Sequence, residues 1–169
     1  MRKIVLIIAV NLSFILGSQA QKFAYVDTDY ILNKIPEFKQ AQDKIDAFSD
    51  DWQKEIEGKY LEVEQMYRSY QQEQVLLTEE MKTKREEAII LKENNAKKLQ
   101  QKYFGPSGDL YLKRKELISP IQDKINDAIQ KLATNNKYQI VFDSSSDLIM
   151  LYKNTNLDKS DKVLELMGY

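Results

Sequence analysis

Apolar residues recur every three or four positions from Phe38 to Tyr70, with polar and charged residues between them. This spacing places the apolar side chains on one face of an α-helix, because about 3.6 residues complete one turn. Pro36 suits the first position of such a helix, since its missing N–H would have no partner there. The pattern therefore predicts one helix that starts at Pro36, and residues 37 to 75 make an arm of about 58 Å at roughly 1.5 Å per residue.

A second helical stripe begins just after Thr78, which is a favourable N-cap residue and is followed by two glutamates. The stripe runs through Met81 and Leu91 and continues beyond them, so the chain turns back after the first helix. The first helix has an excess of acids and the second an excess of bases, which favours antiparallel pairing. We therefore expect a helical hairpin over residues 36–119, with its tip near residues 75–78.

The second stripe is interrupted by helix-breaking residues at two places. Gly105, Pro106 and Gly108 break it part of the way along, and Pro120 lies further on. Proline removes a helical hydrogen bond and glycine lowers helix propensity, so both places favour a bend or a break. Our candidate hinge residues are Gly105, Pro106, Gly108 and Pro120.

Near both ends of the chain the apolar pattern becomes that of strands. Phe23–Val26 forms a short apolar run, and the runs Tyr138–Asp143 and Leu148–Tyr152 flank serines in a way that predicts a β-hairpin. Ser160–Met167 predicts a closing helix that Gly168 ends. We therefore predict an α+β, mainly helical fold with a small β body. Its first part is residues 21–35, and residues 120–169 supply the return helix, the β-hairpin and the C-terminal helix.

The first twenty residues have the three parts of a secretory signal peptide. Arg2 and Lys3 precede an apolar run that ends near Leu16, and small residues at Ser18 and Ala20 suit a cleavage site. The run is shorter than the roughly 20 apolar residues that a membrane-spanning helix needs. We expect residues 1–20 to be removed after Ala20 and the mature protein to lie outside the cytoplasm.

The composition excludes much catalytic chemistry, because the chain has no His and no Cys. It therefore has no imidazole base, no thiol nucleophile and no ordinary zinc site. No glycine-rich nucleotide loop is visible, and the near balance of 25 Lys+Arg against 26 Asp+Glu does not favour a nucleic-acid partner. The acidic pair Asp143 and Asp147 fits turn chemistry better than a cation site. We expect no enzyme activity, no cofactor and no metal.

The order of these segments resembles the OmpH/Skp family of periplasmic chaperones. The resemblance rests on the first strand Phe23–Asp27, the two long helices, the strand Tyr138–Asp143 and the terminal segment Leu157–Leu164. It implies a periplasmic homotrimer, in which strands from three chains form a β body and three helical hairpins enclose unfolded outer-membrane proteins without ATP. By this resemblance the trimerisation body would include Ala24, Val26, Ile140, Phe142, Leu148 and Met150.

This chain departs from the family in charge. Well-known members are strongly basic, whereas this chain has a formal net charge of −1. A lipopolysaccharide site therefore does not transfer to it, and we expect contact with the membrane to be peripheral at most.

Elementary physics is consistent with a homo-oligomer that binds unfolded exported proteins. Two or three short strands leave edges that one chain cannot satisfy, and several arms on one base convert weak apolar contacts into avidity. Each apolar residue near the tip either packs between the two helices or contacts such a client. A structural coiled-coil adaptor or spacer of the cell envelope is the alternative function. The candidate client-binding residues are Met66, Tyr67, Tyr70, Val75, Leu76, Leu77, Met81, Ile89 and Ile90.

Overall fold

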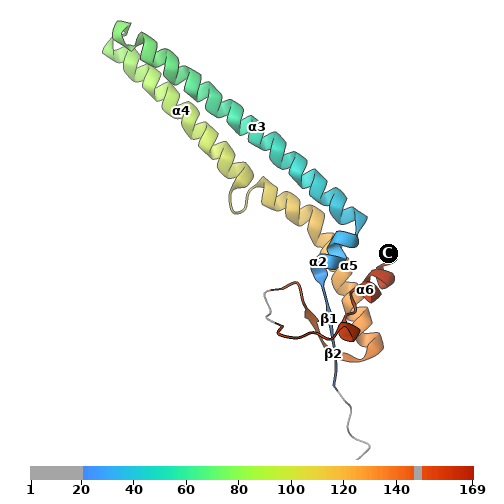
Figure 1. Ribbon diagram of the computed structural model, residues 1–169. Helices are drawn as coiled ribbons and strands as arrows, with labels where there is room; N and C mark the ends of the chain where they lie inside the picture. The colour runs from blue at the N-terminus through green and yellow to red at the C-terminus, as the bar shows by residue number, and fades with distance from the viewer. Residues whose placement is uncertain (1–20, 147–149) are drawn as a thin grey trace, which may run out of the picture. The chain divides into compact units, whose positions relative to one another are not determined.

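The computed structural model describes residues 21–146 and 150–169, which divide into two units (Figure 1). One unit is formed by residues 35–124, and the other by the described residues before 35 and after 124. The predicted signal peptide, residues 1–20, and the predicted body residue Leu148 lie outside the described residues.

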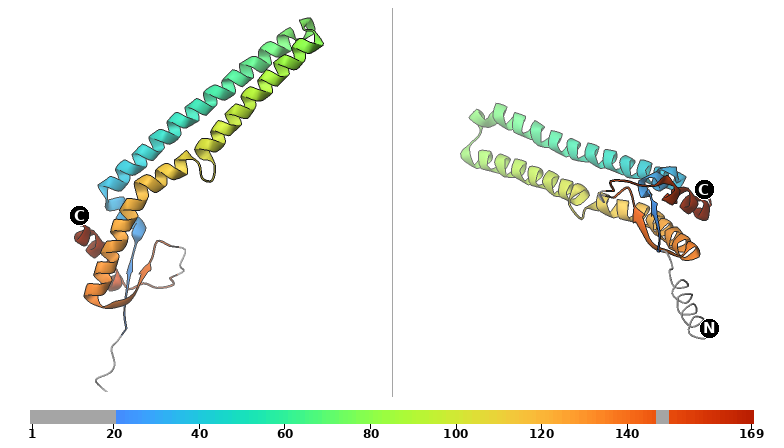
Figure 2. Two further views of the ribbon diagram at one scale, coloured as in Figure 1. Left: turned by 180° about the vertical axis from the view of Figure 1, so that it is seen from behind. Right: turned by 60° about the horizontal axis from the view of Figure 1, so that its bottom comes forward.

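A long antiparallel helical hairpin makes up most of the first unit. Helix α3, Pro36–Glu73, lies beside helix α4, Glu79–Phe104, in every view (Figures 1 and 2). Pro36 is the first residue of α3. The 3-10 turn η1, Gln74–Leu76, reverses the chain, and the hydroxyl of Thr78 accepts the N–H of Met81 at 3.3 Å to cap α4. The local signals in the sequence therefore place the helix ends correctly.

The seam between α3 and α4 is narrow and is filled from both helices. Ile56 and Tyr70 of α3 are buried, as are Ala96 and Tyr103 of α4. An alanine in such a seam lets the two backbones approach closely. The predicted stripe of α4 is thus right at Tyr103 and wrong at Met81 and Leu91, which are 49% and 62% exposed, and it omitted the buried Ala96.

Helix α5, Asp109–Asn136, begins after the loop of residues 105–108. The predicted interruption between Gly105 and Gly108 is therefore present as a true break between two helices. Pro120, in contrast, lies inside α5, which continues through it. Losing one backbone N–H does not end this helix, which is long enough to keep its other hydrogen bonds on both sides.

The second unit contains a sheet of two parallel strands. Strand β1, Lys22–Val26, pairs with strand β2, Tyr138–Asp143, in a register that places Phe23 beside Ile140 and Tyr25 beside Phe142. The predicted β-hairpin is corrected here, since residues 150–152, the described part of the run 148–152, are not in a strand. A strand needs a partner for its backbone groups, and β2 pairs with β1 instead.

Three helices cover the core of this second unit. The short helices α2, Thr28–Lys34, and α6, Ser160–Met167, contact each other, and the last part of α5 also belongs to the unit. Gly168 ends α6 in the left-handed conformation, at φ 93°. None of the helices in the described ranges is long and apolar enough to cross a membrane. The buried apolar side chains are Ala24, Tyr25, Val26, Ile31, Ile125, Ala128, Leu132, Val163 and Leu164.

Candidate functional site

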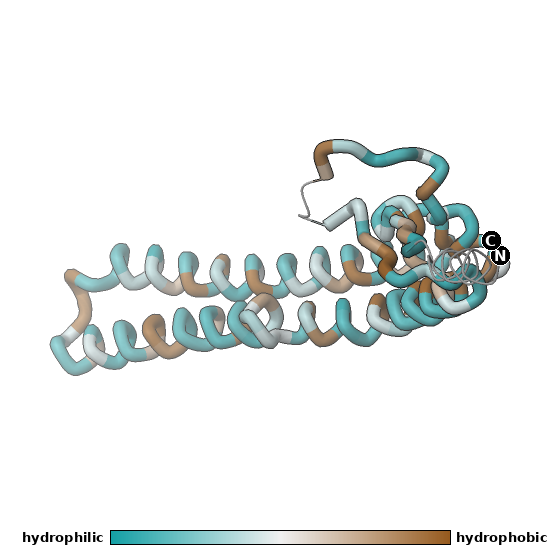
Figure 3. Tube along the Cα trace, turned by 90° about the horizontal axis from the view of Figure 1, so that it is seen from below, coloured by the Kyte–Doolittle hydropathy of each residue, from teal (hydrophilic) through white to brown (hydrophobic). Residues whose placement is uncertain are grey.

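The turn at the end of the hairpin presents the most exposed apolar side chains of α3, η1 and α4. Val75 and Leu76 are each 84% exposed, and the turn has the brown colour of hydrophobic residues in Figure 3. Isolated exposed apolar residues are ordinary, but a cluster at the end of an arm indicates an interaction surface. We call this turn, residues 74–78, the tip.

The other predicted client-binding residues differ in how much of each side chain is exposed. Tyr67, Met81 and Ile90 are about half exposed on the outer half of the hairpin. Met66, Leu77 and Ile89 are partly buried. Ile89 precedes the buried Ala96 by seven residues, so it lies on the seam face of α4.

Tyr70 is removed from the exposed surface. It is 9% exposed, and its hydroxyl donates a hydrogen bond to the carboxylate of Glu86 on α4. This hydrogen bond raises the pKa of Tyr70 above its ordinary value. Tyr70 therefore joins the two helices and exposes little of its side chain.

The sequence analysis did not identify two leucines as exposed. Leu61 on α3 and Leu91 on α4 are 56% and 62% exposed. Leu91 belonged to the predicted seam stripe of α4, which the structure shifts toward Ala96. The seven-residue spacing of Ile89, Ala96 and Tyr103 was the signal that could have identified the true seam.

The charges around the tip are paired within the hairpin. Arg85 of α4 contacts Glu73 of α3 at 3.1 Å, while Lys82 and Lys84 contact glutamates of their own helix. Lower on the arm, Lys92 reaches across to Glu62 at 3.1 Å and, together with Lys59, holds the pKa of Glu62 below its usual range. The basic run at the start of α4 is thus balanced by acids, and the exposed apolar side chains remain its distinctive feature.

The sheet presents a second candidate interaction surface. Phe23, Ile140 and Phe142 are 39%, 47% and 37% exposed. The outer edge of β2 has no neighbouring strand among the described residues, whereas β1 bridges to Asp158 on its other side. An open strand edge beside exposed apolar side chains is a surface suited to strand pairing.

The remaining predicted body residues differ in exposure. Ala24 and Val26 are each 1% exposed, so both belong to the core of a single chain. Met150 is partly buried.

Two aspartate carboxylates accept hydrogen bonds from the first residues of helices α2 and α6. The Asp143 carboxylate accepts the hydroxyl of Thr28 at 2.6 Å and the backbone N–H and hydroxyl of Ser145 at 3.0 and 2.8 Å. The Asp158 carboxylate accepts the N–H and hydroxyl of Ser160, whose oxygen accepts the N–H of Asp27 at 2.9 Å.

These bonds determine the titration of Asp143. Its partial burial alone would raise its pKa, but the hydrogen bonds from Thr28 and Ser145 outweigh burial and lower it. The carboxylate is thus a structural acceptor. Within residues 21–146 and 150–169, no three His, Cys, Asp or Glu side chains are grouped to hold a metal ion.

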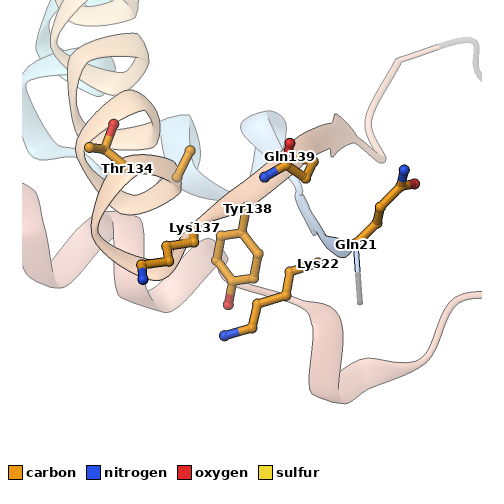
Figure 4. A pocket seen from close by; sticks show the side chains of 7 residues that line it. Gln21, Lys22, Thr134, Lys137, Tyr138 and Gln139 are labelled. Atoms are coloured by element: carbon orange, nitrogen blue, oxygen red, sulfur yellow. The ribbon is translucent and has the colours of Figure 1, made fainter. Parts of the chain in front are cut away.

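A shallow pocket of about 740 Å³ lies where the end of α5 meets the two strands (Figure 4). Lys22, Lys137 and Tyr138 line it together with polar and small residues. Its lining contains no carboxylate that could form an acid–base pair with the amines.

The fold and these surfaces define a class of protein: a long helical hairpin joined in sequence to a small unit with a two-stranded sheet, with exposed apolar surfaces on both. The model of the family described as outer membrane protein (OmpH-like) matches residues 22–167. The chain belongs to this OmpH-like family. The mainly helical α+β fold and the family resemblance expected from the sequence are therefore confirmed.

A solved structure supports the fold assignment. The crystal structure of an outer membrane chaperone (OmpH-like) from Caulobacter crescentus CB15 is similar to this chain with a TM-score of 0.69 and 12% sequence identity. The similarity covers 89% of this chain and 86% of that chain. Comparison with curated proteins found no match.

Proposed function

We propose that this protein is an ATP-independent holdase chaperone of the periplasm that binds unfolded outer-membrane or other exported proteins and prevents their aggregation. Membership of the OmpH-like family and the description of the Caulobacter structure as an outer membrane chaperone support the role. The observation that carries the proposal is the tip, where two aliphatic side chains are 84% exposed on a hairpin whose own seam is already filled.

The chemistry of this surface suits unfolded clients. Val75, Leu76 and Met81 offer apolar area without a shaped pocket, and Tyr67 adds an aromatic ring with a polar end. Methionine and tyrosine adapt to varied partners, so such a surface binds many sequences weakly. Binding of this kind needs no nucleotide, because release follows from the weakness of each contact.

Useful affinity then depends on several arms acting together. We propose that the open edge of β2 and the exposed Ile140 and Phe142 pair with further copies to form a homotrimer. Three arms on one base make the second and third contacts intramolecular, which raises the overall affinity without strengthening any single contact. The signal peptide predicted over residues 1–20, cleaved after Ala20, would deliver the chain to the periplasm.

A dilution assay tests the proposed function. An unfolded β-barrel outer-membrane protein is diluted from urea into buffer, with and without the mature chain, and aggregation is followed by light scattering. We expect suppression of aggregation without nucleotide when the trimer is equimolar with the client. Aggregation at the rate of the control, together with recovery of one folded stoichiometric partner from envelope extracts, would instead support a structural adaptor.

Matched variants locate the binding surface. The double variant Val75→Gln/Leu76→Gln should lose at least half of the protection, because it removes the most exposed apolar area of the arm. Tyr111→Gln/Leu112→Gln, which changes two exposed apolar residues of α5 away from the tip, is the control and should protect like the unaltered chain. Equal protection by both variants would place client binding elsewhere.

A further inference from the structure

The break in the second arm is a compact loop. The N–H of Gly108 donates to the carbonyl of Gly105 at 2.9 Å, and the N–H of Gly105 donates to Gln101 at 2.9 Å. A Cβ at Gly105 would lie 2.3 Å from the carbonyl oxygen of Gln101, and one at Gly108 would lie 2.7 Å from that of Lys102. The glycines are thus required by close packing of the loop against the end of α4.

Helix α3 supports this loop with a row of aromatic rings. The rings of Trp52 and Tyr103 stack at 4.7 Å with an interplanar angle of 8°, and Phe48 stacks on Trp52 at 5.6 Å. The hydroxyl of Tyr103 also donates to Glu55 at 2.8 Å. Tyr103 is the last but one residue of α4, so this row holds the end of that helix against α3.

The other side of the break is held to the same row. The ammonium of Lys113, in the first turns of α5, lies 5.5 Å from the ring centroid of Phe48. Lys102 and Asp109 face each other across the loop at 3.8 Å. Helix α3 therefore contacts both ends of the interruption, through Tyr103 before the loop and Lys113 after it.

We propose that Phe48 and Trp52 form an aromatic lock across the break, so that the second arm bends at residues 105–108 only when Trp52 separates from Tyr103. In the locked form, contact with α3 stops α4 and α5 from bending at the loop between them. This inference concerns the hairpin itself and is independent of the proposed chaperone function. This role explains why the aromatic row of α3 lies beside the break between α4 and α5.

Distance measurements across the loop test the lock. The chain has no native cysteine, so spin labels at Asn94→Cys and Lys115→Cys report the α4-to-α5 distance without background. We expect a narrow distance distribution in the otherwise unaltered chain and at least a twofold wider one in Trp52→Ala. Trp52→Phe, which keeps a ring in the row, should stay close to the unaltered width.

A control and a second readout keep the test decisive. Leu61→Ala changes an exposed residue of α3 outside the row and should leave the distribution narrow. Trp52 is the only tryptophan, so acrylamide quenching of its fluorescence should increase in Tyr103→Leu, even if Trp52→Ala folds poorly. A broad distribution in the unaltered chain, or an unchanged width in Trp52→Ala, would overturn the proposal.

Discussion

Asp143 shows how one side chain connects distant parts of the sequence. Its carboxylate, at the end of β2, holds the first residue of α2 through Thr28. Since a carboxylate is a stronger acceptor than a neutral group, the hydrogen bonds favour the ionised form in the folded state. This lowered pKa makes the stability of the unit depend on pH.

The sign of that dependence follows from the direction of the shift. The folded pKa of Asp143 is below the ordinary value of 3.8, so its stabilising contribution is complete above that value and is lost as pH falls through the folded pKa. We expect Asp143→Asn to lower the melting temperature at pH 7 and the difference to shrink below about pH 4. Thermal melts from pH 7 to pH 2.5 measure this; a constant difference would contradict it. Asp127→Asn, at an exposed position of α5 in the same unit, is the control.

Tyr70 makes a prediction for the hairpin seam. Tyr70→Phe keeps the packed ring and removes only the hydrogen bond to Glu86, whereas Tyr70→Ala also leaves a cavity. We therefore expect a small decrease in melting temperature for Tyr70→Phe and a larger one for Tyr70→Ala, measured by circular dichroism. Equal effects would mean that packing of the ring contributes little.

At the scale of elements, the cap of α4 determines how firmly the tip is held. Thr78→Ala removes the side-chain acceptor for the N–H of Met81, and loss of such a cap costs about 1 kcal/mol. We expect faster amide exchange in residues 79–82 and unchanged exchange near Ala96. Thr78→Ser keeps a hydroxyl and should retain most of the protection. Hydrogen exchange with mass spectrometry gives the comparison, and unchanged exchange in Thr78→Ala would show that the cap is dispensable.

The elements also show what the sequence could predict. Pro36 and Thr78 mark helix starts through local chemistry, so both are readable from a few neighbouring residues. The parallel pairing of β1 with β2 depends on residues more than a hundred positions apart, and no local signal specifies it. The seam of α4 was only partly predicted: Tyr103 stood in the predicted stripe, but Ala96, which is 1% exposed, did not, because alanine gives a weak hydrophobic signal.

In the candidate site, too, the exposure of some residues could be predicted from the sequence and that of others could not. Val75 and Leu76 could be predicted as exposed because a tight turn cannot bury both side chains. Tyr70 could not be separated from them by sequence, since its burial depends on which face of α4 meets α3. The aromatic row was predictable as part of one stripe, and antiparallel pairing about the tip already placed the break opposite residues 46–49, but the stacking of Trp52 on Tyr103 needed the structure.

At the scale of the whole molecule, the proposed assembly depends on the sheet. Ile140→Lys and Phe142→Lys place charges on the exposed apolar face of β2 without touching its pairing with β1. We expect each to convert the proposed trimer to monomers in native mass spectrometry, because burying an unpaired charge at an interface is costly. Tyr152→Lys, at an 83% exposed position outside the strands, is the control. A trimer in all three variants would mean that copies meet through another surface.

The pairing of β1 with β2 has a consequence for the order of folding. β1 is synthesised before the hairpin, yet its partner strand is made only after both arms of the hairpin are complete. The helices can form from neighbouring residues while the sheet waits, and contacts between such distant segments slow folding. Until β2 is available, the edges of β1 therefore have no partner, which exposes the folding chain itself to pairing with strands of other chains.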